Sequence, residues 1–151
     1  MLAFVVNITV LLNLKARAEE NFGTYFHERE KLSEEAAYFK AEAGIKDNDN
    51  VLVVGNGCHY YLLTDTYSKS KYPYCPPATF DNEKNSSEYI DEIKKEYPKM
   101  IIVDDIYKRV VKNKVDGIDA VLAENYEKIG RLRNDHIGWA NADFWVLKKR
   151  L

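Results

Sequence analysis

The stretch Val51-Leu-Val-Val-Gly-Asn-Gly-Cys-His59 decides the fold class. Its first four residues are aliphatic and carry no polar side chain, which predicts a strand buried on both faces. The Gly-x-Gly turn and the apolar residues after it predict a tight turn into a short helix over 59–64. A second apolar run, Met100-Ile-Ile-Val103, follows an amphipathic helix. Strand, helix and strand in this order predict two adjacent parallel strands.

Periodic patterns account for most of the remaining chain. Residues 15–44 carry an apolar stripe at helical spacing and end at Gly44, a typical C-cap. The remaining expected elements are a helix from Ser86 or Ser87 to Pro98, an exposed strand over Lys69–Tyr74, a helix over Ile118–Asn125, and an antiparallel hairpin formed by Tyr126–Leu132 and Ala142–Lys149. We therefore expect an α/β fold: a Rossmann-like α/β/α sandwich, with a mainly parallel sheet and an antiparallel C-terminal hairpin.

Composition limits the class of protein. The 151 residues are 46% hydrophobic and 30% charged, and this balance predicts one globular domain. The formal net charge of −2 gives no global basic field, so we expect no nucleic-acid partner. Cys58 and Cys75 are too few for a zinc site or a disulfide framework and are expected to be buried, inert thiols.

The N-terminal residues 1–14 are apolar except for Asn7, Thr9 and Asn13. They fall short of the roughly 20 residues that span a bilayer. Two interpretations remain open, a core helix or the end of a transmembrane helix, with a signal peptide as a third. We expect residues 1–15 to be the end of a transmembrane or juxtamembrane helix and 16–151 to be a single soluble α/β domain.

The turn after the first strand is a candidate ligand site, comprising Gly55, Asn56, Gly57 and His59. It matches only the first two glycines of the dinucleotide fingerprint, because Tyr60 stands at the third position. A turn that needs small residues for packing is therefore the preferred interpretation, and no cofactor is expected in this chain. The alternative is a stand-alone Rossmann-like domain that binds a nucleotide or related small molecule at this turn.

The carboxylates of Asp104 and Asp105 follow the second apolar run. In nucleoside triphosphatases such acids hold magnesium, but those enzymes also need a Gly-Lys-Ser/Thr loop, which the chain lacks. We expect Asp104 and Asp105 to be solvated loop carboxylates. The three histidines lack metal-ligand spacing, so neither a metal site nor a catalytic residue is expected.

Several short motifs occur in a distinctive order. They are Val51-Leu-Val-Val-Gly-Asn56, Tyr60-Tyr-Leu-Leu-Thr64, Ser70-Lys-Tyr72, the Pro76-Pro77 loop, Pro98-Lys-Met-Ile-Ile-Val103 and Glu124-Asn-Tyr126. As an ordered set over residues 30–150, they resemble the soluble C-terminal domain of polytopic GT-C-type glycosyltransferases, of the dolichyl-phosphate-mannose–protein mannosyltransferase-like or aminoarabinose-transferase-like kind. Lys71 stands where that family usually has arginine.

This resemblance implies a membrane protein whose accessory domain lies on the extracytoplasmic side. The parent enzyme would move a sugar from a polyprenyl-phosphate donor to an acceptor. The family's catalytic carboxylates lie between transmembrane helices that are not in this chain, so this chain alone is expected to be inert. Its expected partners are the membrane-embedded catalytic part of the same protein and the lipid-linked sugar or acceptor. The resemblance adds Ser70, Lys71 and Tyr72 to the ligand-facing candidates.

Overall fold

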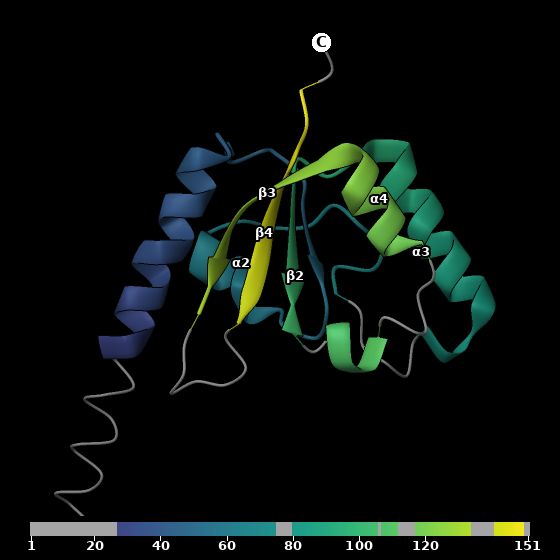
Figure 1. Cartoon of the computed structure of the whole chain (residues 1–151), viewed down its shortest axis with the longest axis horizontal. Helices are drawn as coiled ribbons and strands as arrows, with labels where there is room; N and C mark the ends of the chain where they lie inside the picture. Colours follow the sequence, from purple (N-terminus) through teal and green to yellow (C-terminus); the bar gives the residue numbers. More distant parts are fainter. Residues whose placement is uncertain (1–26, 75–79, 106, 112–116, 134–140, 150–151) are drawn as a thin grey trace, which may run out of the picture.

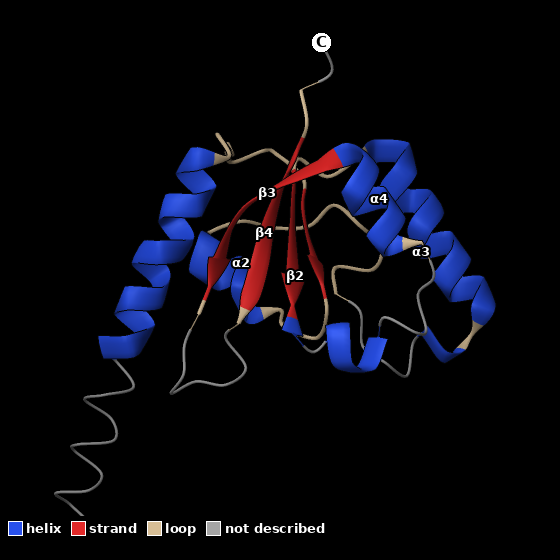
Figure 2. Ribbon diagram, viewed as in Figure 1, coloured by secondary structure: helices blue, strands red, loops and turns tan. Residues whose placement is uncertain are grey.

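The structure, a computed structural model, describes residues 27–74, 80–105, 107–111, 117–133 and 141–149. These residues form a four-stranded sheet with helices on both of its faces (Figure 1, Figure 2). The strands are β1 (Val51–Val54), β2 (Met100–Asp104), β3 (Tyr126–Leu132) and β4 (Ala142–Leu147). The helices are a helix over 27–42, α2 (His59–Thr64), α3 (Glu83–Glu96), the π-helix η2 (Tyr107–Val111) and α4 (Ile118–Asn125). The fold is therefore mixed α/β.

The strand order is β1-β2-β4-β3. β1 and β2 are parallel, with Val51 opposite Met100 and Val54 opposite Val103, as the two apolar runs predicted. β4 pairs antiparallel with both β2 and β3, so the predicted C-terminal hairpin is confirmed. The expectation of a mainly parallel sheet is wrong for the described strands. The hairpin takes the free edge of β2, where another parallel strand would have needed a long crossover connection.

The sheet is buried on both faces because β1 and β2 carry apolar side chains at every position except Asp104. Leu52 and Ile101 point to the face covered by α3 and α4, where they meet Tyr89 and Leu122. Val51 and Val53 point to the opposite face, which is covered by the helix over 27–42 and by α2. The other buried residues on that face include Leu32, Ala36, Tyr60, Met100, Ile102 and Phe144. Alternation along two short strands thus builds two cores.

The free edge of β1 is covered without a further strand. The N–H of Val53 donates to the hydroxyl of Tyr61 at 3.0 Å, and that hydroxyl donates to the carbonyl of Pro73. The N–H of Val51 reaches the carbonyl of Tyr67 at 3.4 Å. The strand expected over Lys69–Tyr74 is therefore wrong, because the Tyr61 hydroxyl takes the place of a continuous backbone ladder.

Helix α3 begins earlier than Ser86 or Ser87, so the predicted start is wrong. The side chain of Asn82 accepts a hydrogen bond from the N–H of Lys84 at 2.9 Å and caps the helix at Glu83. The hydroxyl of Ser86 bonds instead to the carbonyl of Phe80 at 3.3 Å. Asn82 caps as well as serine does, and it lies one turn nearer the N-terminus.

The helix over 27–42 packs on the sheet through Leu32, Ala36 and Phe39. The Phe39 ring lies 4.8 Å from the Phe144 ring and directly over Gly130 of β3, where a Cβ atom would overlap the phenyl carbons. Gly44 adopts a φ of +60° and follows the end of this helix, as predicted. The close approach of helix and sheet therefore depends on the missing side chain at position 130.

None of the helices among the described residues is long and apolar enough to cross a bilayer. Residues 1–15, expected to end a transmembrane or juxtamembrane helix, lie outside the described residues.

The substitution Gly130→Ala tests the contact between Phe39 and β3. The added methyl group must displace the Phe39 ring, and we expect a destabilisation of about 1–3 kcal/mol, measured by urea unfolding. In the double variant Phe39→Leu/Gly130→Ala the shorter side chain makes room, so the second substitution should cost less than in the wild type. Equal cost of Gly130→Ala in both backgrounds would contradict this packing.

Candidate functional site

Because β1 and β2 are parallel, their carboxyl ends meet at one edge of the sheet. The turn of Gly55, Asn56 and Gly57 follows β1 there, and Asp104 ends β2 beside it. The Asp104 side chain accepts hydrogen bonds from the N–H of Asn56 and from the N–H of Tyr107, each at 2.8 Å. Asp104 is only 1% exposed, so the expectation of a solvated carboxylate is wrong for this residue. It is a buried anchor for two loops.

Both glycines of the turn are explained by packing. A Cβ atom on Gly55, whose φ is +147°, would overlap the Asp104 carboxylate, and one on Gly57 would overlap the Tyr60 ring. A phosphate at this turn would need free backbone N–H groups, yet the Asn56 N–H is held by a carboxylate. The geometry favours the packing interpretation over the nucleotide-binding alternative.

His59 begins α2 and lies against Tyr60, with the two rings 4.1 Å apart. Burial lowers the pKa of His59 to about 4, so the imidazole is neutral at pH 7. Burial also raises the pKa of the Tyr60 hydroxyl, with smaller contributions from Asp104 and Asp105. Neither ring carries a charge that would attract an ionic ligand at neutral pH.

Ser70, Lys71 and Tyr72 bind carboxylates of α3. The Ser70 hydroxyl donates to Glu92 at 3.0 Å, and the Lys71 ammonium and the Tyr72 hydroxyl reach Glu88 at 2.8 and 2.9 Å. The hydrogen bond from Lys71 holds the pKa of Glu88 below its usual value. An anion at Lys71 would therefore compete with a carboxylate that is already bound.

The seven candidate residues do not form one site. Ser70 lines a small hollow with Asn50 and Pro98, at the amino end of β1, whereas the Gly55 turn follows its carboxyl end. Tyr72 packs on Phe80 and Tyr89 under α3, which is the opposite face of the sheet from His59 and Tyr60.

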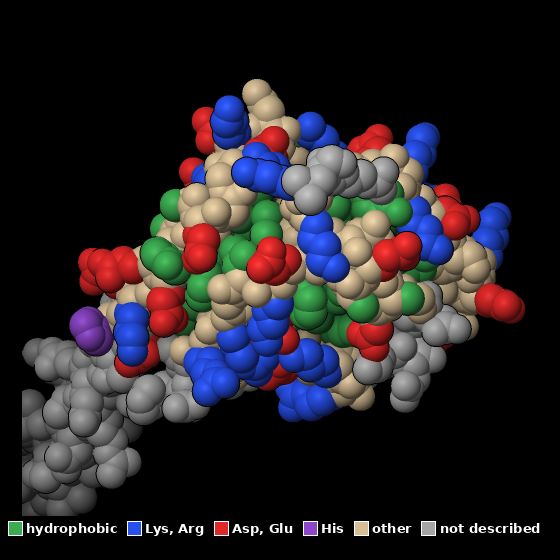
Figure 3. Space-filling view, turned by 45° about the horizontal axis from the view of Figure 1, so that its top comes forward, with side chains coloured by type: hydrophobic (Ala, Val, Ile, Leu, Met, Phe, Trp, Pro, Cys, Tyr) green, Lys and Arg blue, Asp and Glu red, His purple; other side chains and the backbone are tan. Residues whose placement is uncertain are grey.

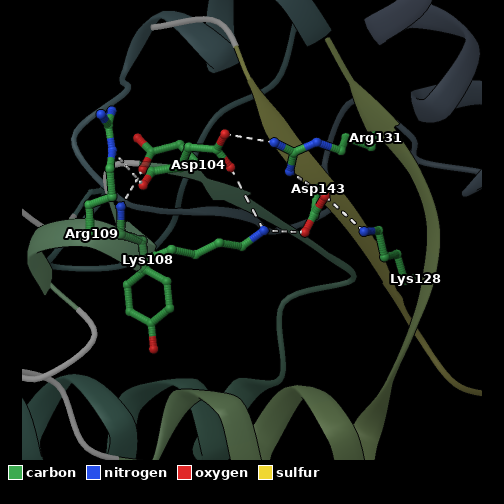
Figure 4. A network of polar contacts seen from close by, with 8 residues as sticks. Asp104, Lys108, Arg109, Lys128, Arg131 and Asp143 are labelled. Atoms are coloured by element: carbon green, nitrogen blue, oxygen red, sulfur yellow. Dashed lines mark hydrogen bonds and ion pairs between the residues drawn. The ribbon is translucent and has the colours of Figure 1, made fainter.

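A network that the sequence analysis missed surrounds Asp143 on β4 (Figure 4). The Asp143 carboxylate binds Lys108 at 2.7 Å, Lys128 at 2.9 Å and Arg131 at 2.8 Å. The other arm of the Arg131 guanidinium binds Asp105 at 2.6 Å. These five side chains, the Asp143 network, connect the end of β2 and the start of β4 with η2 and β3.

The sheet itself positions the network. Arg131 is directly opposite Asp143, and Lys128 is opposite Trp145, two positions further along β4 on the same face. Residues 128 and 131 of a regular strand would point to opposite faces, but the register shift between Lys128 and Gly130 inserts an extra residue. The bulge thus directs both cations at one carboxylate.

The electrostatics of the network are nearly balanced. Desolvation works to raise the pKa of Asp143, but hydrogen bonds from Lys108, Lys128 and Arg131 outweigh it and lower the pKa to about 2. The two carboxylates raise the pKa of Arg131. A general acid or base needs a pKa near the working pH. The pKa of Asp143 lies far below neutral pH, so this carboxylate suits a role in holding η2, β3 and β4 together more than one in proton transfer.

Two smaller expectations concern metals and thiols. Within the described ranges, no three His, Cys, Asp or Glu side chains gather in a geometry that could hold a metal ion. Cys58 is a free, exposed thiol and not a buried one, because it precedes α2 with its side chain toward solvent. Cys75 lies outside the described residues.

Comparison with known proteins gives no relative. No family model, curated protein or solved structure matches the chain.

The variant Asp143→Asn tests the network through pH. A carboxyl group whose pKa is about 2 when folded and 3.8 when unfolded stabilises the fold above pH 4, and this contribution disappears as the pH falls from about 4 to 2. We expect the contribution to be about 2 kcal/mol, from 1.36 kcal/mol per pKa unit. In urea unfolding at pH 2–7, the variant should be less stable at pH 7 and lose less stability below pH 4. The control is Asp91→Asn, at an exposed position of α3. Identical pH dependence of stability for Asp143→Asn and the wild type would refute the stabilising role of the Asp143 carboxylate.

The Asp104 carboxylate occupies the space at the Gly55 turn, and this leads to a prediction about cofactors. Because Asp104 holds the Asn56 N–H and brings negative charge to the turn, NAD, ATP and S-adenosylmethionine should show no heat of binding in calorimetry with the protein. A low-micromolar affinity that His59→Ala abolishes would establish the nucleotide-binding alternative.

Proposed function

We propose that the chain is a non-catalytic, extracytoplasmic accessory domain of a GT-C-type membrane glycosyltransferase. The catalytic part of the same protein would move a sugar from a polyprenyl-phosphate donor to an acceptor. This domain would cover that membrane site and help to position the lipid-linked sugar or the acceptor. The proposal includes the finer fold assignment, a Rossmann-like sandwich whose sheet is extended by the C-terminal hairpin.

The order of the motifs supports the proposal. The Val51–Val54 run is β1, residues 60–64 lie in α2, and the Ser70–Tyr72 segment binds α3. Pro98–Val103 leads into β2, and Glu124–Tyr126 joins α4 to the hairpin. Each of these motifs therefore lies on a different element of the sheet or of the helices that cover it, while the Pro76-Pro77 loop lies outside the described residues. This distribution supports their interpretation as a fold signature and not as an active site.

The chemistry of the sheet's carboxyl edge supports an accessory role. Ligands of open α/β sheets usually bind at this edge. Here Asp104 fills the turn, and both carboxylates of the Asp143 network are paired with cations of the same network. An edge occupied by the protein's own side chains suits a domain that stabilises a partner more than one that performs chemistry.

The observation that carries the proposal is the position of basic side chains. The described chain begins at His27, at the end of the molecule where β2 ends (Figure 1). Five basic side chains lie on η2, on β3 or directly after β3: Lys108, Arg109, Lys128, Arg131 and Arg133. Figure 3 shows Lys and Arg side chains crowded at the lower edge of the face it displays. Four acids, Asp104, Asp105, Glu127 and Asp143, lie on or beside the same elements and leave an excess of 5 − 4 = 1 positive charge.

Such an excess suits a surface that faces phosphate groups of lipids. Each basic residue near an anionic membrane contributes about 1 kcal/mol of binding energy. The apolar residues 1–14 join the chain before His27, so anchor and basic surface would act on the same membrane.

Vesicle flotation tests this orientation. The wild-type chain should float with vesicles that contain anionic lipid, and Arg109→Gln/Arg133→Gln should float less, with an effect that added salt removes. Both arginines are exposed and lie outside the Asp143 network. Lys46→Gln/Lys69→Gln removes the same charge from two exposed side chains near the amino end of β1, at the other end of the molecule, and serves as the matched control.

Deletion of residues 1–14 tests the anchor separately. It should reduce association with neutral and anionic vesicles alike and leave the thermal unfolding midpoint nearly unchanged. Loss of folding in this variant would make the segment a core helix. Equal flotation of both charge variants would contradict the proposed orientation, and sugar transfer from a polyprenyl-phosphate donor by this chain alone would contradict the accessory role.

A further inference from the structure

A groove of ≈ 660 Å³ lies at the end of the molecule opposite the Asp143 network. Its lining residues come from the carboxyl end of α3, from the segment that leads into β2 and from the end of β4. Half-buried Tyr97, Val146 and Leu147 supply an apolar floor. The size is that of a small-molecule site.

Five lysines surround this floor, and none of the residues that line the groove is acidic. Two of the five are held by the protein. The ammonium of Lys99 binds Asp49 at 2.7 Å and the carbonyl of Gly44 at 2.6 Å, and that of Lys148 donates to carbonyls at the end of α4. The other three are Lys94, Lys95 and Lys149.

These three lysines are exposed, and no carboxylate in the described part of the chain lies within ion-pair distance of them. Lys94 and Lys95 are in the last turn of α3, where cations interact favourably with the helix dipole. That effect does not account for Lys149, which follows β4, or for the absence of acids among the residues that line the groove. The arrangement leaves three positive charges facing one apolar hollow.

The backbone of Tyr97 is a second, independent observation. Tyr97 caps α3 with a φ of 40° and a ψ of 88°, a left-handed conformation in which glycine is the usual residue. Such a residue costs of order 1 kcal/mol or more and often marks a ligand contact. Its ring forms part of the groove floor, so the conformation keeps an aromatic surface beside the lysines.

We propose that this groove binds a phosphate monoester attached to an apolar chain. One dianionic phosphate would compensate the unpaired ammonium groups of Lys94, Lys95 and Lys149, and the apolar chain would lie on Tyr97 and Leu147. The carboxyl end of α3 offers carbonyl groups and no free N–H groups. The lysines alone must therefore hold the anion, which makes binding dependent on these side chains and on salt. The site is independent of the membrane orientation proposed above.

Amide chemical-shift titration of the full chain with decyl phosphate, kept below its micelle concentration, tests the site. Decyl phosphate should shift the amides of Tyr97, Leu147 and Lys148. Lys94→Gln/Lys95→Gln/Lys149→Gln should weaken binding by about tenfold or more, because charge-assisted hydrogen bonds are lost. Lys31→Gln/Lys84→Gln, at exposed positions far from the groove, should bind as the wild type does. All substituted residues are exposed, so circular dichroism should show unchanged folding.

Two further ligands separate the parts of the proposal. Inorganic phosphate tests the anion alone and decanol tests the apolar chain alone; each should bind far more weakly than decyl phosphate. Inorganic phosphate that binds equally well would overturn the role of the apolar floor, and decanol that binds equally well would overturn the role of the lysines. Absence of shifts around Tyr97, or equal loss of affinity in both sets of variants, would overturn the site itself.

Discussion

The buried carboxylate of Asp104 is the interaction on which the carboxyl edge of the sheet depends. A buried charge must be compensated, and Asp104 is compensated by the N–H groups of Asn56 and Tyr107. Those two bonds fix the turn after β1 and the start of η2. Because η2 carries Lys108, the position of Asp104 also determines that Lys108 reaches Asp143. Gly55 completes the arrangement, since a side chain there would occupy the space of the carboxylate.

The parts of the fold that could be predicted from the sequence depend on the order of apolar and polar residues within one element. Val51–Val54 and Met100–Val103 are apolar throughout and could only be buried strands, and the alternation after Tyr126 could only suit a hairpin. The parts that could not be predicted depend on single side chains with distant partners. The Tyr61 hydroxyl, and not a further strand, bonds to the free edge of β1, and Asn82, not Ser86, caps the N-terminus of α3. The Asp143 network needed the bulge at Lys128, which leaves no clear signal in the sequence.

The bulge in β3 links the two faces of the sheet. On one face it brings Lys128 and Arg131 to the same carboxylate. On the other face it places Gly130, a residue without a side chain, beneath Phe39 of the helix over 27–42. A regular strand would satisfy only one of these requirements, because shifting the register by one residue exchanges the faces. The same irregularity therefore supports helix docking and charge pairing, and a change in either should be felt in the other.

The distribution of charge shows why net charge is a poor guide to local binding. The whole chain has a net charge of −2, yet basic side chains gather at both ends of the sheet. At the carboxyl end of β2 they are mostly paired with Asp105 and Asp143, which gives rigidity and leaves a small excess of charge. At the opposite end Lys94, Lys95 and Lys149 have no acidic neighbour in the groove. Paired charges are typical of a structural role, whereas unpaired charges beside an apolar floor are typical of a ligand site. The groove, and not the Gly-x-Gly turn, is therefore the part of this domain whose side chains are suited to bind an anionic ligand with an apolar chain.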